Sequence, residues 1–92
     1  MTTYETAINA IITALVDNRV PFTVNILYDG LQLRFPWHEG DVACHSGTYD
    51  SNLGYVESFE FPWDDGGVTV LEPEKMALRI VNYYEEVKNN DR

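Results

Sequence analysis

The spacing of apolar residues is helical at both ends of the chain and alternating in the middle. Residues 3–17 predict a helix, because apolar side chains recur every three or four positions, at Tyr4, Ile8, Ile11, Ile12 and Leu15. Thr2 and Glu5 are three residues apart at its start, which is the spacing of a capping box. We expect the helix to end at Asn18, shortly before Pro21.

A β-hairpin is expected directly after this helix. Residues 22–28 and 31–35 have the composition of strands, and the Asp29-Gly30 pair between them is a strong signal for a two-residue turn. Within the second strand, alternation separates an apolar face from a polar face. The apolar face carries Leu31, Leu33 and Phe35, and the polar face carries Gln32 and Arg34.

Three further strands are predicted at residues 42–46, 54–61 and 68–71. The polar segment 46–53 between the first two of them is expected to be a mobile loop. In the strand 54–61, alternation places Tyr55, Phe59 and Phe61 on one face and Val56, Ser58 and Glu60 on the other.

A second helix is expected to close the chain. Pro73, with Glu72 and Glu74 beside it, is typical of a first helical turn, where the missing N–H is harmless and carboxylates favour the dipole. The predicted buried side of this helix carries Met76, Ile80, Tyr84 and Val87, with Ala77, Val81 and Tyr83 beside them. The order α-β-β-β-β-β-α predicts an α+β fold, an antiparallel sheet with two helices packed on one face.

An eight-residue sequence, which we call the FPW motif, occurs twice. Phe35-Pro36-Trp37-His38-Glu39-Gly40-Asp41-Val42 returns 26 residues later as Phe61-Pro62-Trp63-Asp64-Asp65-Gly66-Gly67-Val68, with five of eight positions identical. We expect each copy to end a strand at Phe, to stop the ladder at Pro and to reverse the chain at Gly. The two Trp residues are either core residues whose indole N–H meets a carbonyl group or anchors at the rim of an interface.

Length and composition limit the class of protein. The 92 residues make one domain, 1–92, and 45% hydrophobic residues suffice for a core, which excludes a disordered acidic tail. The longest apolar runs are far below the roughly 20 residues of a membrane span, and no signal-peptide pattern opens the chain. The single cysteine, Cys44, forms no internal disulfide. We therefore expect a cytoplasmic protein without membrane contact.

The formal net charge of −9 is concentrated in the middle of the chain. No Lys or Arg lies between Arg34 and Lys75, and that window holds nine acids: Glu39, Asp41, Asp50, Glu57, Glu60, Asp64, Asp65, Glu72 and Glu74. The charge argues against direct binding to nucleic acid, which requires clustered Lys and Arg. Two interpretations stay open: a solubilising surface, or an acidic face that gathers on the sheet side opposite the helices and binds a basic partner.

Metal binding and catalysis have weaker support. His38, Cys44 and His45 are side chains that suit zinc, but their spacing matches no common zinc pattern, so no metal or other cofactor is predicted. Cys44 and His45 are adjacent and point to opposite faces of a strand, which opposes a thiolate–imidazole pair. Glu57 is the one carboxylate expected on an apolar strand face, which makes it the best candidate for acid–base catalysis, but a register slipped by one residue or an edge position explains the pattern more simply. No phosphate loop or nucleophile elbow occurs, so we expect no enzyme.

The small size, the acidity, the single domain and the lack of a catalytic motif resemble those of small acidic inhibitors encoded by phages and mobile elements. This class includes anti-CRISPR and anti-restriction proteins that mimic DNA. The resemblance implies a non-catalytic protein that occupies the basic, nucleic-acid-binding surface of a host defence effector such as a CRISPR nuclease.

On this hypothesis the partner-binding side chains are Glu39, Asp41, Asp64, Asp65, Glu57, Glu60, Trp37 and Trp63. Two alternatives remain, and the expected state is a monomer or a homodimer. In the first alternative, the strand 22–28 or the last strand pairs with a second copy to build a homo-oligomeric assembly. In the second, zinc stabilises a protein-interaction module.

Overall fold

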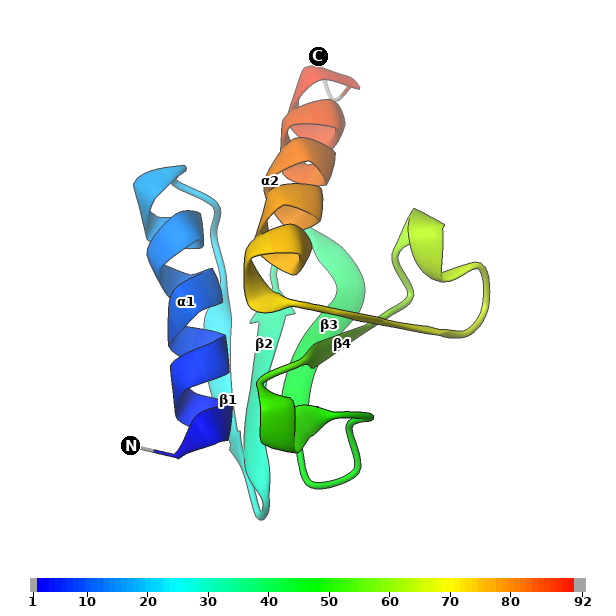
Figure 1. Ribbon diagram of the computed structural model, residues 1–92. Helices are drawn as coiled ribbons and strands as arrows, with labels where there is room; N and C mark the ends of the chain where they lie inside the picture. Colours follow the sequence, from blue (N-terminus) through cyan, green and yellow to red (C-terminus); the bar gives the residue numbers. More distant parts are fainter. Residues whose placement is uncertain (1, 91–92) are drawn as a thin grey trace.

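The computed structural model describes residues 2–90 as two helices packed on one face of a five-stranded antiparallel sheet (Figure 1). The strands lie side by side in chain order, and the α-β-β-β-β-β-α sequence of elements is the predicted one. The elements are α1 (Thr3–Asp17), β1 (Thr23–Leu27), β2 (Gly30–Phe35), β3 (His38–His45), the 3₁₀ turn η1 (Ser51–Leu53), β4 (Val56–Phe59), the 3₁₀ turn η2 (Pro62–Asp64), β5 (Val68–Leu71) and α2 (Pro73–Asn90).

Both ends of α1 agree with the prediction from the sequence. The Glu5 backbone N–H donates to Thr2 Oγ1 at 3.1 Å, and the Thr2 N–H donates to Glu5 Oε1 at 3.4 Å, so the capping box is present. Asn18 is the C-terminal cap. Each of these bonds satisfies a backbone donor that the first helical turn cannot pair internally.

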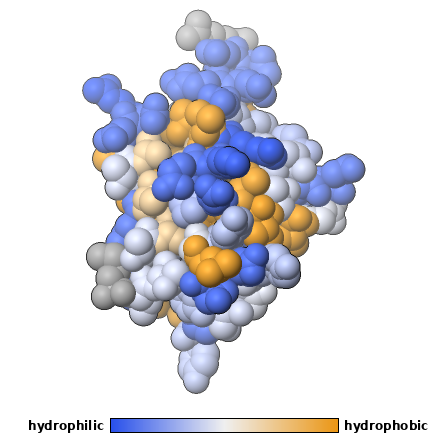
Figure 2. Space-filling view, in the orientation of Figure 1, coloured by the Kyte–Doolittle hydropathy of each residue, from blue (hydrophilic) through white to orange (hydrophobic). Residues whose placement is uncertain are grey.

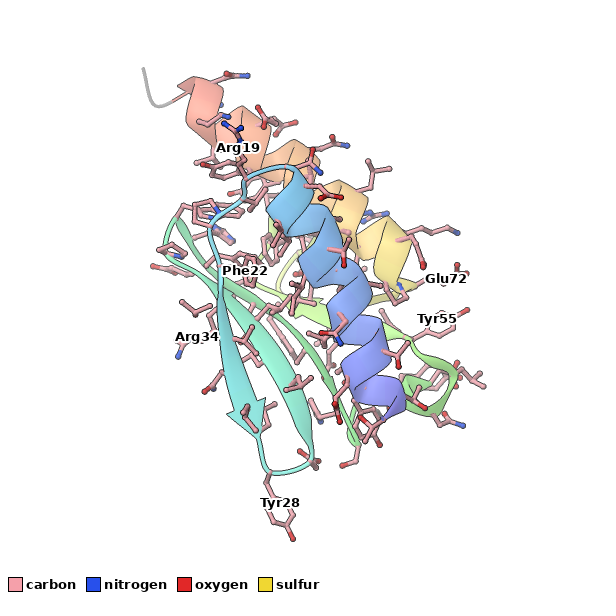
Figure 3. All side chains as sticks on the ribbon, turned by 90° about the vertical axis from the view of Figure 1, so that its left-hand side faces the viewer. Arg19, Phe22, Tyr28, Arg34, Tyr55 and Glu72 are labelled. Atoms are coloured by element: carbon pink, nitrogen blue, oxygen red, sulfur yellow. The ribbon has the colours of Figure 1, made fainter. Side chains whose placement is uncertain are left out.

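The core lies between the sheet and the two helices, which Figure 3 shows edge-on as two layers. Its fully buried members come from both helices and from the three central strands: Ile8, Ile11, Leu15, Leu33, Val42, Val56, Met76 and Ile80. Each fully buried aliphatic side chain contributes about 1.5–3 kcal/mol relative to an exposed one. The opposite face of β2 carries its polar residues, and Arg34 points away from the helices (Figure 3).

The β1–β2 turn is displaced by one residue from the predicted position. Leu27 pairs with Gly30, so the turn residues are Tyr28 and Asp29 rather than Asp29 and Gly30. Gly30 is needed inside β2 for a different reason, because a Cβ atom there would lie 2.2 Å from the Cys44 carbonyl oxygen of β3. Gly30 is therefore required for the close approach of β2 to β3 and not for the turn.

β3 begins four residues earlier than the predicted strand 42–46. Phe35 pairs with His38, so the chain reverses at Pro36 and Trp37 and enters β3 at once. The register shifts between Arg34 and Phe35, which lets the turn close so tightly. The first FPW motif is therefore a hairpin turn, and its glycine lies within a strand.

β4 is shorter than the predicted strand 54–61, and backbone conformation explains both ends. Gly54 before it and Glu60 after it have φ angles of 90° and 64°, in the left-handed region that a strand cannot include. The segment 46–53, predicted as a mobile loop, contains η1, which packs against α1, and its Thr48 is buried. No helix within residues 2–90 has the length and hydropathy that a bilayer span requires.

Candidate protein-binding surface

The two FPW motifs, far apart in the chain, meet in one aromatic cluster. The His38 ring of the first copy lies 4.6 Å from the Phe61 ring of the second, measured between centroids. Trp37 and Trp63 each lie 6.0 Å from Tyr83 of α2. Helix α2 therefore holds the two motifs together at one end of the sheet.

In the first copy, the hairpin turn directs Trp37 toward the helix side. Its indole N–H donates to the Pro21 carbonyl oxygen at 2.9 Å, and its ring lies 4.9 Å from Tyr84. The ring also contacts Phe35 at 5.2 Å. Trp37 thus closes the end of the core and ties β2 to the segment that precedes β1.

In the second copy, Asp64 organises a buried polar network. Its carboxylate accepts the Phe61 backbone N–H at 3.0 Å and the Ser58 hydroxyl at 2.8 Å. The Trp63 indole N–H in turn donates to Ser58 Oγ at 3.0 Å. Asp64 is buried, so it caps η2 and is not available to a partner, contrary to the prediction from the sequence.

Neither tryptophan has a free indole N–H, and both are half-buried against the core. These contacts agree with the first of the two interpretations, in which both Trp residues belong to the core. Trp63 also keeps one exposed side, which lines a hollow of about 290 Å³ with Tyr83 of α2. Arg79 lies over this ring, with its guanidinium carbon 5.8 Å from the centroid.

Glu57 is buried on the sheet face away from the helices, and its carboxylate is hydrogen-bonded inside the molecule. His45 Nε2 lies 2.8 Å from Glu57 Oε1, and the Thr48 hydroxyl donates to the same oxygen at 2.8 Å. His45 Nδ1 accepts the Gly47 N–H at 2.9 Å, so the ring proton is on Nε2 and points at Glu57. Glu57 is therefore a structural carboxylate rather than part of an exposed acidic face.

Asp41 is half-buried at the middle of the same face. It accepts a hydrogen bond from Gln32, whose own Oε1 accepts from Asn25 at 2.9 Å, so three strands are linked by one polar row. Burial raises the pKa of Asp41 above its usual value, although the Gln32 bond and the nearby Arg34 charge oppose that rise. Its second oxygen, Oδ1, is buried without a hydrogen-bond partner.

Three of the predicted acids remain exposed, and we call Glu39, Glu60 and Asp65 the acidic rim. His38 Nε2 lies 2.8 Å from the Glu60 carbonyl oxygen, which joins the start of β3 to the end of β4. Glu39 and Glu60 therefore lie at the same end of the sheet. Asp65 directly follows η2 in the aromatic cluster at that end. The backbones of Glu60 and Asp65 are both left-handed, with φ angles of 64° and 48°.

Contrary to the expectation from the sequence, the nine acids do not gather on one flank opposite the helices. Asp64 bonds Ser58 on the helix side of the sheet, and Glu72 and Glu74 lie at the start of α2. The reason is that the chain leaves the sheet after β4 and returns at β5 (Figure 1), and Trp63 of the second motif packs against Tyr83 of α2. Figure 2, which views the helix-bearing face, shows hydrophilic residues of all kinds beside hydrophobic ones on that face.

The weak zinc candidates are each occupied by other contacts. His38 contacts the Glu60 carbonyl, His45 contacts Glu57, and the buried Cys44 thiol donates to the Tyr55 carbonyl oxygen at 3.3 Å. Burial, with a smaller effect of the Glu57 charge, raises the pKa of Cys44 to about 11, which opposes the thiolate that zinc requires. Among residues 2–90, no three His, Cys, Asp or Glu side chains converge on a metal position.

The described chain thus offers a partner one exposed acidic rim beside an aromatic cluster, while Asp64 and Glu57 serve the fold. Comparison of the chain with protein-family models, with curated proteins and with solved structures finds no match.

Proposed function

We propose that this protein is a non-catalytic acidic binding protein whose acidic rim docks on a basic surface of another protein. The proposed partner is a nucleic-acid-binding effector of host defence, such as a CRISPR nuclease, which the protein would inhibit. Such effectors line their grooves with Lys and Arg to bind phosphates. Carboxylates held on a rigid sheet end are suited to occupy those side chains.

The observation that carries the proposal is the backbone of Glu60 and Asp65. Both residues are exposed, and both have left-handed φ angles, 64° and 48°, that glycine would adopt without strain. A side chain such as that of Glu60 costs about 1–2 kcal/mol in that conformation, and the short side chain of Asp65 costs less. Neither carboxylate forms an ion pair with Lys or Arg, since within residues 2–90 the one such pair is Lys88 with Glu85. Strain at an exposed, unpaired charge supports a role in binding.

The interior supports a binding role rather than catalysis. The Glu57 carboxylate is engaged by His45 and Thr48, and the Cys44 thiol is buried with a raised pKa. A nucleophile or general base has to be near its operating pKa and open to a substrate. These groups instead stabilise the sheet, and the exposed carboxylates are left for recognition.

The test uses two pairs of variants, which separate charge from backbone strain. Glu60→Gly and Asp65→Gly remove the charge and the strain, while Glu60→Gln and Asp65→Asn remove the charge alone. We expect Glu60→Gly to gain about 0.5–1 kcal/mol in the free energy of unfolding, measured with urea, and Asp65→Gly to gain less. Combined in pairs, they give two double variants, Glu60→Gly with Asp65→Gly and Glu60→Gln with Asp65→Asn. We expect both double variants to bind at least tenfold more weakly to the partner.

The partner is obtained by affinity capture from a bacterial lysate at about 50 mM and about 500 mM NaCl, because charge-driven binding weakens as salt screens it. A captured basic protein is then tested for displacement from duplex DNA in a gel-shift competition. Salt-sensitive capture that both double variants lose supports the proposal. Capture that is unchanged in Glu60→Gln with Asp65→Asn would exclude the acidic rim as the contact.

A further inference from the structure

β1 is an edge strand with little to protect it (Figure 3). Natural edge strands are commonly blocked by a charge, a proline or a bulge. The segment Thr23–Leu27 has none of these, and its register with β2 runs without a shift. Because α1 packs over β2 and β3, it leaves Val24 47% exposed and Ile26 82% exposed.

An apolar groove of about 810 Å³ runs between this strand and α1. Val24 and Ile26 line it from the sheet, and Tyr4 and Ile12 line it from the helix. Tyr28, fully exposed, projects from the hairpin at its end (Figure 3). An exposed apolar strip beside an unpaired backbone edge is the surface that strand addition requires.

The phase of the β1 hydrogen bonds follows from the hairpin. In a two-residue hairpin the closing pair, here Leu27 with Gly30, exchanges hydrogen bonds, and every second residue along the strand does the same. Val24 and Ile26 therefore turn their N–H and C=O groups away from β2. The outward backbone groups belong to the residues whose apolar side chains line the groove.

We propose that the occupant of this edge is the β1 strand of a second copy, added antiparallel so that the two five-stranded sheets become one. One register pairs the outward N–H and C=O groups of both Val24 and Ile26. It places Asn25 opposite Asn25 of the second copy. Val24 then pairs with Ile26 of the second copy, and Phe22 pairs with Tyr28. Such β-branched and aromatic cross-strand pairs each contribute about 0.2–1 kcal/mol.

The charges that flank β1 favour a copy of this chain as the occupant. Arg19, whose N–H donates to the Val16 carbonyl at the end of α1, precedes the strand, and Asp29, whose carboxylate accepts from the Ser46 hydroxyl, follows it. Figure 3 shows Arg19 and Tyr28, the neighbour of Asp29, toward opposite ends of this edge. In the antiparallel register, Asp29 of one copy is opposite position 21 of the other, two residues from its Arg19. Opposite charges therefore approach at both ends of the interface. The other edge strand, β5, has only four residues and no Arg19-like cation before it.

The salt dependence separates this interface from the proposed function, on which it does not rest. Two copies of net charge −9 repel each other over long range, and salt screens that repulsion. Dimerisation should therefore strengthen between about 50 mM and about 500 mM NaCl, whereas binding to a basic partner should weaken.

A cysteine at the proposed two-fold axis tests the register. Asn25→Cys should form a disulfide-linked dimer under mild oxidation, because the two residues form a non-hydrogen-bonded pair whose Cα atoms lie about 4.5 Å apart, within the range of a disulfide. Thr23→Cys is the matched control on the same strand and face. Its thiols would be four residues apart, about 13 Å, too far for a disulfide. Equal cross-linking of both variants would overturn the register.

The state of the unmodified chain tests the interface itself, by light scattering on a sizing column over a range of concentrations and at both salts. We expect a concentration-dependent dimer that Ile26→Lys abolishes, with the circular dichroism spectrum unchanged. Leu78→Lys, at another exposed apolar site, 62% exposed on α2, should leave the dimer intact. A strict monomer at all concentrations and both salts, or a dimer that survives Ile26→Lys, refutes the proposal.

Discussion

The two FPW motifs share five of eight residues but fold differently. The first is a hairpin turn in which Pro36 and Trp37 reverse the chain between β2 and β3. The second is a 3₁₀ turn that leaves the sheet, and its Asp64 accepts the Phe61 backbone N–H at 3.0 Å. The fourth position explains this difference, because a carboxylate caps a helical turn from there and the imidazole of His38 packs on Phe61 instead.

The shared glycine also has two functions. Gly40 lies within β3, where a Cβ atom would approach the Phe59 carbonyl oxygen to 2.4 Å. Gly66 lies in the loop after η2, with a φ angle of 82° and open space around it. One glycine is required for close contact and the other for its backbone conformation, so a repeated sequence does not imply a repeated structure.

Loss of the Asp64 cap should have the largest effect. Asp64→Ala leaves the buried Phe61 N–H and the Ser58 hydroxyl without their acceptor. Since hydrogen bonds to a charged group each contribute about 1.5–3 kcal/mol, we expect a loss of about 3 kcal/mol in the free energy of unfolding, measured with urea. Asp65→Asn, next to it but exposed, should change stability by less than about 0.5 kcal/mol. Equal losses for the two would contradict the cap.

Variants at Gly40 and Gly66 should differ in the free energy of unfolding, measured in the same urea assay. Gly40→Ala forces a methyl group against backbone and should cost about 2–3 kcal/mol. Gly66→Ala meets no atom and bears the left-handed strain alone, about 1 kcal/mol. Gly66→Asn, which tolerates that conformation, should recover part of the loss, while Gly40→Asn should be at least as damaging as Gly40→Ala. If Gly40→Asn were more stable than Gly40→Ala, close contact between position 40 of β3 and the Phe59 carbonyl oxygen would be contradicted.

The smallest effect is expected at Asp41, whose pKa is raised by burial. A raised pKa in the folded state means that ionisation of Asp41 destabilises the fold. The stability that protonated Asp41 contributes is therefore lost as the pH rises through the pKa of Asp41, from about 4 upward. Asp41→Asn should therefore exceed the parent in stability by about 0.5 kcal/mol at pH 7. The difference should vanish near pH 3. Glu39→Gln, exposed on the same strand, is the control and should show no such gain in thermal melts.

Local signals predicted most of the fold. The helix at residues 3–17, its Thr2–Glu5 capping box and the start of α2 at Pro73 agree with the structure, because caps and helical periodicity act within a few residues. The separation of Leu33 and Phe35 from Arg34 in β2 also agrees, since alternation sets which strand face is buried.

The site was less predictable, because burial of a charge depends on distant neighbours. Nothing near Glu57 in the chain shows that His45 lies 2.8 Å away, and nothing near Asp64 shows that Ser58 faces it. Both carboxylates appeared in the sequence as members of an acidic face. One local signal was available: an Asp three residues after Phe61, with Pro62 between them, has the spacing of a turn cap.

By itself the sequence determined the order and type of the elements and the excess of negative charge, since propensity, periodicity and composition are properties of the local chain. Only the tertiary structure decided which carboxylates are exposed, how the two FPW motifs meet on Tyr83 and which strand edge stays bare. Those outcomes depend on contacts between segments far apart in the chain, where packing and the cost of burying a charge outweigh local preference.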